Sequence, residues 1–275
     1  MKNPPPKLYV RGCFPAPAHY KYLCVIGSRK WTTYGRDAVN RIISGLRGYP
    51  ISIVSGLAIG IDSIAHMAAL EAGLHCVAFP GSSLAWNKIY PPRHKELARR
   101  IIDSGGAVVS PWKSDDIVGK WAFPVRNELM AALSHATLIV EAGKRSGSLM
   151  TAKHAEDMGR DVLAVPGHIS AKQSYGPHML IRSGAALITC AADVLRELGF
   201  EPTENDQVAN TVLNIDKESR AILDLISLEE QTATSIKDQL KMPIQTLNEK
   251  LSLLEIKGLI KMEDMMYKLA NGNMY

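Results

Sequence analysis

Residues 1–200 alternate short, β-branched apolar runs with segments long enough to form helices. Apolar runs that end in Gly, Ser or Pro are typical of strands buried on both faces of a sheet. Strand–helix–strand repetition therefore predicts a Rossmann-like α/β fold, in which a mostly parallel sheet carries helices on both faces. Strands are expected at Leu23–Ile26, Ile51–Val54, Cys76–Phe79, Ala107–Val109, Thr137–Val140, Asp161–Val165 and Ala186–Thr189, with crossover helices at Gly35–Leu46, Ser63–Ala72 and Lys95–Ser104.

A smaller second domain is expected after residues 201–214, which are polar, aperiodic and typical of a linker. Three helices followed by a β-ribbon is the winged-helix pattern. The stretches that match it are Ser219–Ile226, Thr234–Leu240, Ile244–Lys257 and a hairpin from Gly258 through Leu269. The predicted organisation is a lead-in at 1–22, a Rossmann-like domain at 23–200, a linker at 201–214 and a winged-helix domain at 215–275.

The net charge of +5 is the sum of two opposite contributions. Residues 1–200 contain 24 Lys and Arg against 14 Asp and Glu, which gives +10, whereas residues 201–275 contain 8 against 13, which gives −5. A basic larger domain favours a polyanionic partner such as nucleic acid, and an ordinary solvated surface is the alternative. The acidic second domain does not favour a polyanion.

Several classes of protein are excluded by composition. No apolar run approaches the ~20 residues that span a bilayer, and Met1–Pro6 lacks the apolar core of a signal peptide. The four cysteines are scattered without a CxxC pair, which argues against a disulfide framework and against a zinc site. We therefore expect a cytoplasmic protein with no membrane association.

Ligands of open α/β sheets bind beyond the carboxyl ends of the strands, so the strand-exit loops form the candidate site. After the first strand, Gly27 lets the backbone approach a ligand, and Ser28 with nearby N–H groups can hold a phosphate. Arg29 follows directly and can grip that phosphate with two hydrogen bonds. A tight turn with a solvated arginine is the alternative interpretation.

Two further strand-exit loops contain the Gly and Ser residues that form phosphate nests. The groups that they offer are Ser55, Gly56 and Gly60 after the second strand, and Ser146, Gly147 and Ser148 after the fifth. The later loop also leads into a helix that is expected to begin near Ser148, where N-terminal N–H groups attract anions. Asp62 is expected to cap the helix that follows the earlier loop.

The segment 120–128 mixes cations with aromatic residues, just before a helix expected at Leu129–Leu133. Aromatic rings stack on bases while Lys and Arg hold phosphates, so this segment is a candidate contact strip for a single strand. Its candidate residues are Lys120, Phe123, Arg126 and Asn127. The alternative is a loop that tucks its rings into the core, an interpretation that fits Trp121 better than Phe123.

The motifs of several enzyme classes are missing from the sequence. The glycine spacing does not match GxGxxG, and no GxxxxGK[ST] or HExxH motif occurs. No nucleophile–base pair is apparent, no loop pairs two carboxylates, and the eight histidines lack metal-ligand spacing. We therefore expect no catalytic residue, no metal and no cofactor, and a run of phosphates explains the converging anion sites better than one small anion.

The first domain contains an ordered series of motifs, which are Val25–Arg29, Ser55–Asp62, Ile89–Pro91, Phe123–Asn127, Val140–Ala142, Ser146–Ala152 and Ala164–Gly167. With these motifs the chain resembles the DprA/Smf family over residues 5–200, and residues 215–270 look like the winged helix that many members carry. The resemblance implies a cytoplasmic, non-enzymatic protein that binds single-stranded DNA and forms a homodimer through the Rossmann-like domain. It also implies that the protein brings a RecA-type recombinase onto incoming DNA in natural transformation.

The resemblance further implies roles for individual residues. Arg29 and Arg126 would bind the DNA backbone, Phe123 would lie against a base, and Lys120 would add a basic contact. The loops Ser55–Gly60 and Ser146–Ser148 would line the pocket.

The chain departs from the family pattern at four positions that are usually basic. These positions hold Ile59, Val125, Glu128 and His135. Each phosphate contact that is missing lowers the salt dependence of single-strand binding by a slope of ~0.7. We therefore expect weaker DNA binding than in a typical member, or a divergent role.

Other functions stay open on the sequence alone. The same Rossmann-like superfamily includes small-nucleotide sensors and nucleotide N-glycosidases similar to the lysine-decarboxylase-like group, for which Glu141 would be a polar anchor. A scaffold that acts through its winged helix is a third hypothesis. Because the expected recognition helix Pro243–Lys257 carries as many acidic as basic residues, we expect it to contact protein rather than duplex DNA.

Overall fold

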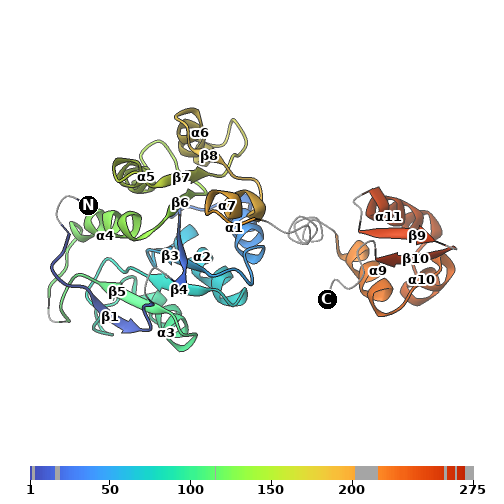
Figure 1. The fold of residues 1–275 in the computed structure, drawn as a ribbon, viewed down its shortest axis with the longest axis horizontal. Coiled ribbons are helices and arrows are strands. Elements are labelled where there is room, and N and C mark those ends of the chain that lie inside the picture. Colours follow the sequence, from blue (N-terminus) through green and yellow to red (C-terminus); the bar gives the residue numbers. More distant parts are fainter. Residues whose placement is uncertain are drawn as a thin grey trace. The chain divides into compact units, whose positions relative to one another are not determined.

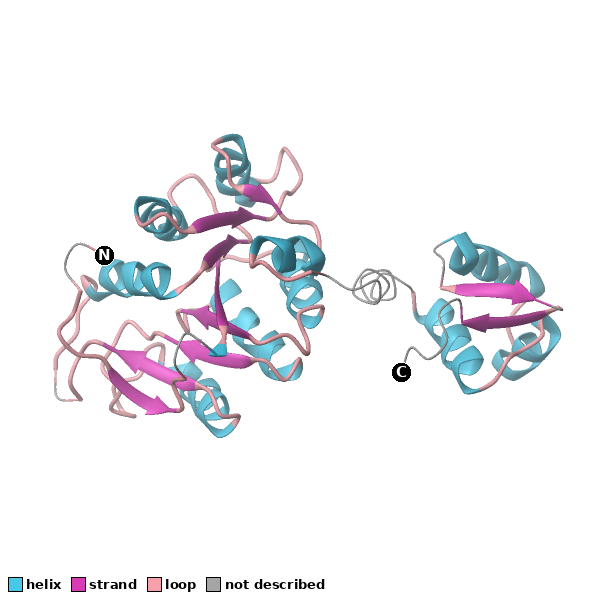
Figure 2. Cartoon of the chain, in the orientation of Figure 1, coloured by secondary structure: helices cyan, strands magenta, loops and turns pink. Residues whose placement is uncertain are grey.

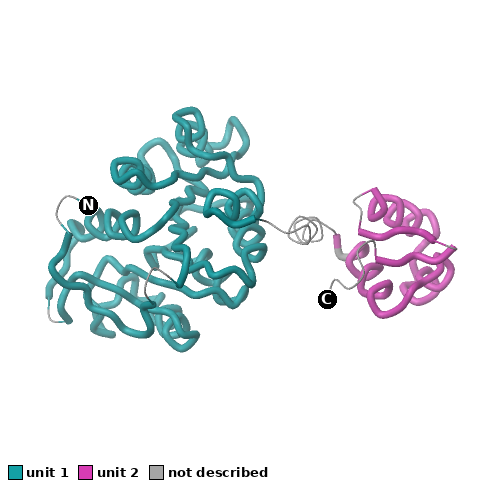
Figure 3. Tube along the Cα trace, viewed as in Figure 1, with its two compact units in different colours: residues 1–201 teal, residues 202–275 magenta. Residues whose placement is uncertain are grey.

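The computed structural model describes residues 1, 4–15, 19–114, 116–201, 216–256, 259–263 and 265–269. The chain divides into two compact units, Met1–Glu201 and Pro202–Tyr275, which Figure 3 colours separately. Apart from Glu201, the linker expected at 201–214 lies outside the described residues.

The described strands of the first unit form one eight-stranded sheet in the order β1-β5-β4-β3-β2-β6-β7-β8 (Figures 1 and 2). Their bounds are β1 (Tyr9–Gly12), β2 (Lys21–Ile26), β3 (Ile51–Ser55), β4 (His75–Ala78), β5 (Ala107–Ser110), β6 (Ala136–Ile139), β7 (Asp161–Ala164) and β8 (Ala186–Leu187). Neighbouring strands pair in parallel, except that β1 runs antiparallel to β5 at one edge. The mostly parallel Rossmann-like sheet that the sequence predicts is therefore confirmed.

The helices of this unit cover both faces of the sheet. Their bounds are α1 (Thr33–Ser44), α2 (Ile61–Glu71), α3 (Lys95–Asp103), α4 (Ala122–Leu133), α5 (Gly147–Asp157), α6 (Tyr175–Arg182) and α7 (Ala191–Glu197), with short 3-10 helices at Pro92–His94 and Lys172–Ser174. Along β2, Leu23 and Val25 pack into the core shared with α1, α2, α3 and α7. The alternate residues Tyr22 and Cys24 pack into the core shared with α4 and α5. This alternation is the period of two that a strand buried on both faces requires.

The edge strand β1 was not predicted from the sequence. Its four residues alternate between half-buried and exposed positions and contain no apolar run. The central strands were found because five consecutive residues of β3, Ile51–Ser55, are all buried. Burial on both faces leaves a strong signal in a sequence, whereas a half-exposed edge leaves a weak one.

The helix α4 begins earlier than the sequence indicates. A loop was expected at 120–128 before a helix at Leu129–Leu133, but the helix spans Ala122–Leu133. Pro124 lies in the first turn of this helix, where backbone N–H groups have no helical partner and a proline is tolerated. Phe123, Arg126 and Asn127 therefore project from a helix instead of a loop.

The second unit has three helices and a β-hairpin, the winged-helix arrangement that was predicted. In its described residues these are α9 (Lys217–Leu228), α10 (Ala233–Leu240), α11 (Ile244–Ile256), β9 (Ile260–Glu263) and β10 (Met266–Leu269). Side chains at helical spacing, among them Ile222, Ile236 and Leu251, form its separate core. Among the described helices of the whole chain, none has the length and apolar character to cross a bilayer.

Candidate functional site

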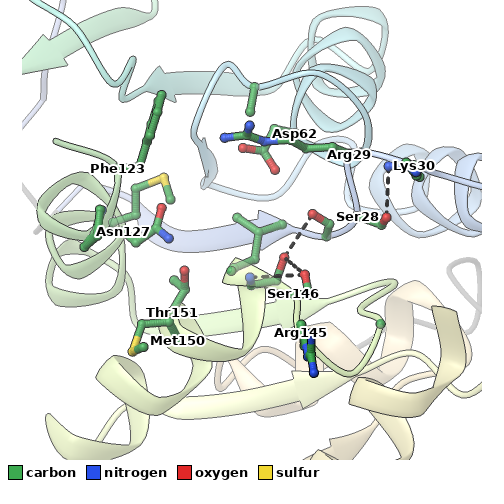
Figure 4. Close-up of a pocket in the computed structure, with 18 of the residues that line it drawn as sticks. Ser28, Arg29, Lys30, Asp62, Phe123, Asn127, Arg145, Ser146, Met150 and Thr151 are labelled. Carbon is green, nitrogen blue, oxygen red and sulfur yellow. Dashed lines mark hydrogen bonds between the residues drawn. The ribbon is translucent and has the colours of Figure 1, made fainter. Parts of the chain in front are cut away.

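A cavity of about 730 Å³ opens at the carboxyl ends of β2 and β6 (Figure 4). Its walls come from Gly27–Lys30 after β2, from the first turns of α4, and from Gly143–Ser148 at the start of α5. The chain leaves β2 toward β3 on one side and later places β6 on the other side. The cavity therefore lies at the topological switch point of the sheet, where open α/β folds bind their ligands.

The lining of this cavity is strongly basic. The charged residues among its described lining are Arg29, Lys30, Arg126, Lys144 and Arg145, against the single acid Asp62. Arg29, Lys30, Lys144 and Arg145 are exposed, whereas Arg126 and Asp62 are buried. A concave surface with this excess of positive charge attracts anions.

The loop after β2 is held in place by close backbone packing. A side chain at Gly27 would collide with Ile61, whose Cγ1 would lie 2.7 Å from the new Cβ. Gly60 has a φ of +97° and packs against Ser28 and Arg29, and the amide of Ile61 donates to the carbonyl of Ser28 at 3.2 Å. These contacts set the position of Ser28 and Arg29 at the rim of the cavity.

The start of α5 is joined to the exit of β2. Ser146 is the N-cap, and its hydroxyl accepts from the amide of Ser148 at 3.3 Å. The hydroxyl of Ser148 in turn donates to the carbonyl of Gly27 at 2.9 Å. The predicted anion-binding serines thus also connect the two walls of the cavity, while Gly147 has open space around it.

Arg126 lies at the floor of the cavity and is only 4% exposed. Its Nη1 donates to the carbonyls of Gly56 and Phe79, the latter at 3.0 Å, and its Nε donates to Asn127 Oδ1 at 3.0 Å. Burial lowers the pKa of the guanidinium, and the nearby carboxyl of Asp62 opposes that change. This burial, which no sequence pattern indicates, ties Arg126 to the interior as well as to the cavity.

Asp62 is not the cap of α2 that the sequence suggested. Gly60 occupies the N-cap position, and Asp62 lies in the first turn, 6% exposed, facing the cavity. Burial raises its pKa, while the guanidinium of Arg126 and the amides of Ala58 and Gly56 act in the opposite direction. The carboxyl therefore turns back toward the loop after β3.

Phe123 stands at one side of the cavity and is half-buried (Figure 4). The guanidinium carbon of Arg29 lies 5.3 Å from the centre of its ring, and that of Arg126 lies 5.9 Å away. Trp121, which the alternative interpretation tucked into the core, is instead 58% exposed and packs edge-on against Trp112. An aromatic ring and an exposed cation thus meet at the rim, the pairing that base stacking and phosphate binding require.

The structure brings most of the predicted site residues together, but not all of them. The predicted residues that line the main cavity are Gly27, Ser28, Arg29, Phe123, Arg126, Asn127, Ser146, Gly147 and Ser148. Gly56 lines a small adjoining pocket with Ile59 and Tyr90. Ser55, Gly60 and Lys120 line neither cavity; Ser55 is buried and donates to the carbonyl of Val25 at 2.7 Å.

Sequence reasoning missed several residues of the lining as binding candidates. Lys30, Lys144 and Arg145 lie in the predicted loops and could have been found from their charge. Gln173 comes from the short helix before α6, and its Nε2 donates to the carbonyl of Lys30 at 3.0 Å. No motif marks this glutamine, because its position depends on a long-range contact.

The four departures from the family pattern lie outside the main cavity. Ile59 lines only the adjoining pocket. His135 lies at the opposite, amino-terminal edge of the sheet, where its Nδ1 accepts from the amide of Tyr22 at 2.9 Å. The absence of a cation at these four positions therefore leaves the basic lining of the main cavity unchanged.

Glu141, which would be a polar anchor under the nucleotide-pocket hypothesis, already accepts hydrogen bonds from Thr32. It is 4% exposed, does not line the cavity, and accepts from the amide of Thr32 at 3.0 Å and from the Thr32 hydroxyl. Thr32 is the N-cap of α1, so Glu141 stabilises the beginning of that helix. Among the residues that the structure describes, no His, Cys, Asp and Glu cluster has the arrangement of a metal site.

Comparisons with known proteins agree with this fold. The model of the family "DNA recombination-mediator protein A" matches residues 1–199. Protein Smf of Escherichia coli is 41% identical over 196 residues, which are 71% of this chain and 52% of that protein. DNA processing protein DprA of Streptococcus pneumoniae is 41% identical over 178 residues, 65% of this chain and 62% of that protein. The chain thus spans little more than half the length of these relatives.

Two solved structures are similar to the first unit. The X-ray structure of DNA processing protein A from Streptococcus pneumoniae has a TM-score of 0.63 and 37% identity, covering 71% of this chain and 67% of its own. DNA processing protein A from Helicobacter pylori, whose structure concerns its single-stranded DNA binding mode, has a TM-score of 0.64 and 28% identity. That match covers 72% of this chain and 89% of the Helicobacter chain.

Proposed function

The chain belongs to the DNA recombination-mediator protein A family, the DprA/Smf family, and on that premise we propose that its cavity binds single-stranded DNA. One observation carries the proposal. The exposed guanidinium of Arg29 lies 5.3 Å from the ring of Phe123 at the rim of a basic cavity. Arg29 would hold a phosphate while Phe123 stacks on the adjoining base.

The remaining groups of the cavity extend this binding. Lys30, Lys144 and Arg145 are exposed and line the same cavity, so a flexible chain of phosphates would meet cations on both walls. Arg126 would contribute from the floor, through its charge and through the loops that it holds. Asn127 beside it offers an amide for a base or a sugar.

Family membership also supports a more specific proposal about the role of this binding. We propose a recombination mediator that binds incoming DNA, helps to load a RecA-type recombinase and acts as a homodimer without altering the DNA chemically. The Helicobacter relative supports the choice of single-stranded DNA as the ligand.

The winged-helix unit is proposed to contact protein. Its helix α11 exposes Ile244, Leu253 and Ile256 beside acidic side chains. Lys250, a cation of this helix, is held by Asp216 at 2.9 Å and by Glu218 at 3.4 Å. A helix that reads duplex DNA presents free basic side chains, which this arrangement does not favour.

The direct test is oligothymidylate binding at low salt, compared between the wild type and Arg29→Ala. We expect micromolar binding by the wild type and a strong loss in the variant. Arg47→Ala is the matched control, since Arg47 is an exposed arginine that donates to the Glu71 carbonyl away from the cavity. No oligonucleotide binding by the wild type, or equal binding by Arg29→Ala, would refute the proposal, as would turnover of a nucleoside monophosphate by a sample that ignores oligonucleotides.

A further inference from the structure

Two exposed aromatic rings, Trp31 and Tyr175, lie on segments next to the cavity lining residues Lys30 and Gln173. Trp31 follows the β2 exit loop directly and is 42% exposed, and Tyr175 is the first residue of α6 and is 41% exposed. Neither belongs to the buried clusters of the two cores. Each ring therefore leaves part of its surface open to contact with a ligand.

A positively charged side chain lies close to each of these rings. The guanidinium carbon of Arg36 lies 5.8 Å from the centre of the Trp31 ring, and Nζ of Lys144 lies 5.8 Å from the centre of the Tyr175 ring. Phe123 has the same arrangement with Arg29. Trp31 and Tyr175 therefore each pair with a cation, as Phe123 does.

Trp31 and Tyr175 are connected to the cavity by residues that line it. Lys144 lines the cavity, and Lys30, which precedes Trp31, lines it too. Gln173 lies two residues before Tyr175 and donates to the carbonyl of Lys30, which brings the segments carrying Trp31 and Tyr175 together. Figure 4 shows Lys30 on the side of the cavity opposite Phe123.

Tyr34, a third exposed aromatic residue nearby, has a structural role instead. Its hydroxyl donates to the carbonyl of Pro166, and its ring packs close to Gly167. It therefore joins α1 to the exit of β7 and is not free to stack on a ligand. Trp31 and Tyr175 have no such bond among the described contacts.

We propose that Trp31 and Tyr175 form a second base-stacking subsite for the single strand, which rests on the proposed function of the cavity. A strand held at Phe123 and Arg29 would pass Lys30 and Lys144. Its later bases would then stack on these two rings. Every base has a stacking face, so the subsite takes unpaired bases of any sequence. It would add affinity only to strands long enough to reach it.

The experiment compares oligothymidylates of about 4 and about 16 nucleotides, a span typical of single-strand sites. The full chain is used as wild type, as the double variant Trp31→Leu with Tyr175→Leu, and as the double variant Trp31→Phe with Tyr175→Phe. Leucine keeps an apolar side chain but has no stacking face, whereas phenylalanine keeps the face. Thermal melting confirms that each variant folds, which the exposure of both residues leads us to expect.

In the leucine variant, affinity for the short oligomer should stay within twofold of the wild type, while affinity for the long oligomer should fall at least about tenfold, because stacking contributes ~1–3 kcal/mol per base. The phenylalanine variant should keep the affinity for the long oligomer but lose the quenching of tryptophan fluorescence that stacking on Trp31 produces.

Two results would overturn the proposal of a second stacking subsite. The leucine variant could bind both lengths as the wild type does, or it could lose affinity equally for both, which would place the rings in the primary cavity. Failure of the wild type to bind either length would instead refute the proposed function itself, so the two failures are distinguishable.

Discussion

Arg126 and Asp62 approach each other across Gly56, so close that a side chain at Gly56 would collide with Nη1 of Arg126 and with Oδ2 of Asp62. Both charged side chains are buried beneath the basic cavity. Arg126 also holds the carbonyls of Gly56 and Phe79, which belong to the loops after β3 and β4. The floor of the cavity is therefore a charged assembly inside the protein.

Arg126→Ala should destabilise the first unit by about 3–5 kcal/mol, because it removes the buried counter-charge of Asp62 and the donor to the carbonyls of Gly56 and Phe79. Chemical denaturation measures this change in the free energy of unfolding. Adding Asp62→Asn should recover part of the loss, since the two residues are coupled. If Arg126→Ala keeps full stability and reduces only DNA binding, the interior role of Arg126 is wrong.

Gly60→Ala should weaken both folding and DNA binding. With φ at +97°, an added Cβ would meet Ser28 and lie 2.8 Å from Cα of Arg29, so the loop that presents Arg29 must shift. The strain alone costs about 1–3 kcal/mol. Gly48→Ala is the matched control, because Gly48 has a φ of +84° with nothing within 4 Å of the added Cβ. The melting temperature and the oligonucleotide affinity should both fall further for Gly60→Ala than for Gly48→Ala. Equal losses in the two variants would show that the collision of the added Cβ with Ser28 and Arg29 is unimportant.

Removing an exposed cation of the cavity should change the salt dependence of DNA binding. Each phosphate contact on a single strand contributes about 0.7 to the slope of log affinity against log salt. Arg145→Ala and Lys30→Ala should each reduce the steepness of that slope by up to about this amount. Titrations at several salt concentrations measure it, with Arg47→Ala as a variant of unchanged slope. Identical slopes for all variants would mean that these cations do not touch phosphates.

The first unit should lose stability as the pH falls below 6.5. Burial lowers the pKa of His66 from 6.5 to about 3, so the unfolded chain binds a proton in this window that the folded chain does not. Stability attributable to His66 is then complete above pH 6.5 and declines by about 1.4 kcal/mol per pH unit below it. His66→Gln should flatten the profile between pH 6.5 and pH 4 by that slope. A profile with the wild-type slope in the variant would contradict this assignment.

The sequence predicted the sheet better than the cavity, for physical reasons. Strands such as Ile51–Ser55 are buried on both faces and therefore consist of apolar runs that a single sequence displays. The loops Gly27–Arg29 and Ser146–Ser148 were found because glycine and serine followed a strand and preceded a helix, the place where backbone N–H groups form anion nests. The edge strand Tyr9–Gly12 has only alternate partial burial and was missed.

The side-chain environment could not be predicted in the same way. Trp121 is exposed and Arg126 is buried, the reverse of what hydrophobicity suggests. Both outcomes depend on residues far away in the sequence, since Arg126 bonds Gly56 and Phe79, and Trp121 packs on Trp112. Gln173 reaches Lys30 across the fold for the same reason. Such contacts are fixed by the tertiary arrangement of the loops.

The hydrogen bonds from Thr32 to Glu141 fasten the start of α1 to the exit of β6. The opposing walls of the cavity are therefore anchored to β2 and β6, which are neighbouring parallel strands in the middle of the sheet. A force that separates these walls would act on the backbone hydrogen bonds between two central strands, and not on the edge strands β1 and β8. The position of the cavity thus places such a load on strands that have a neighbour on each side.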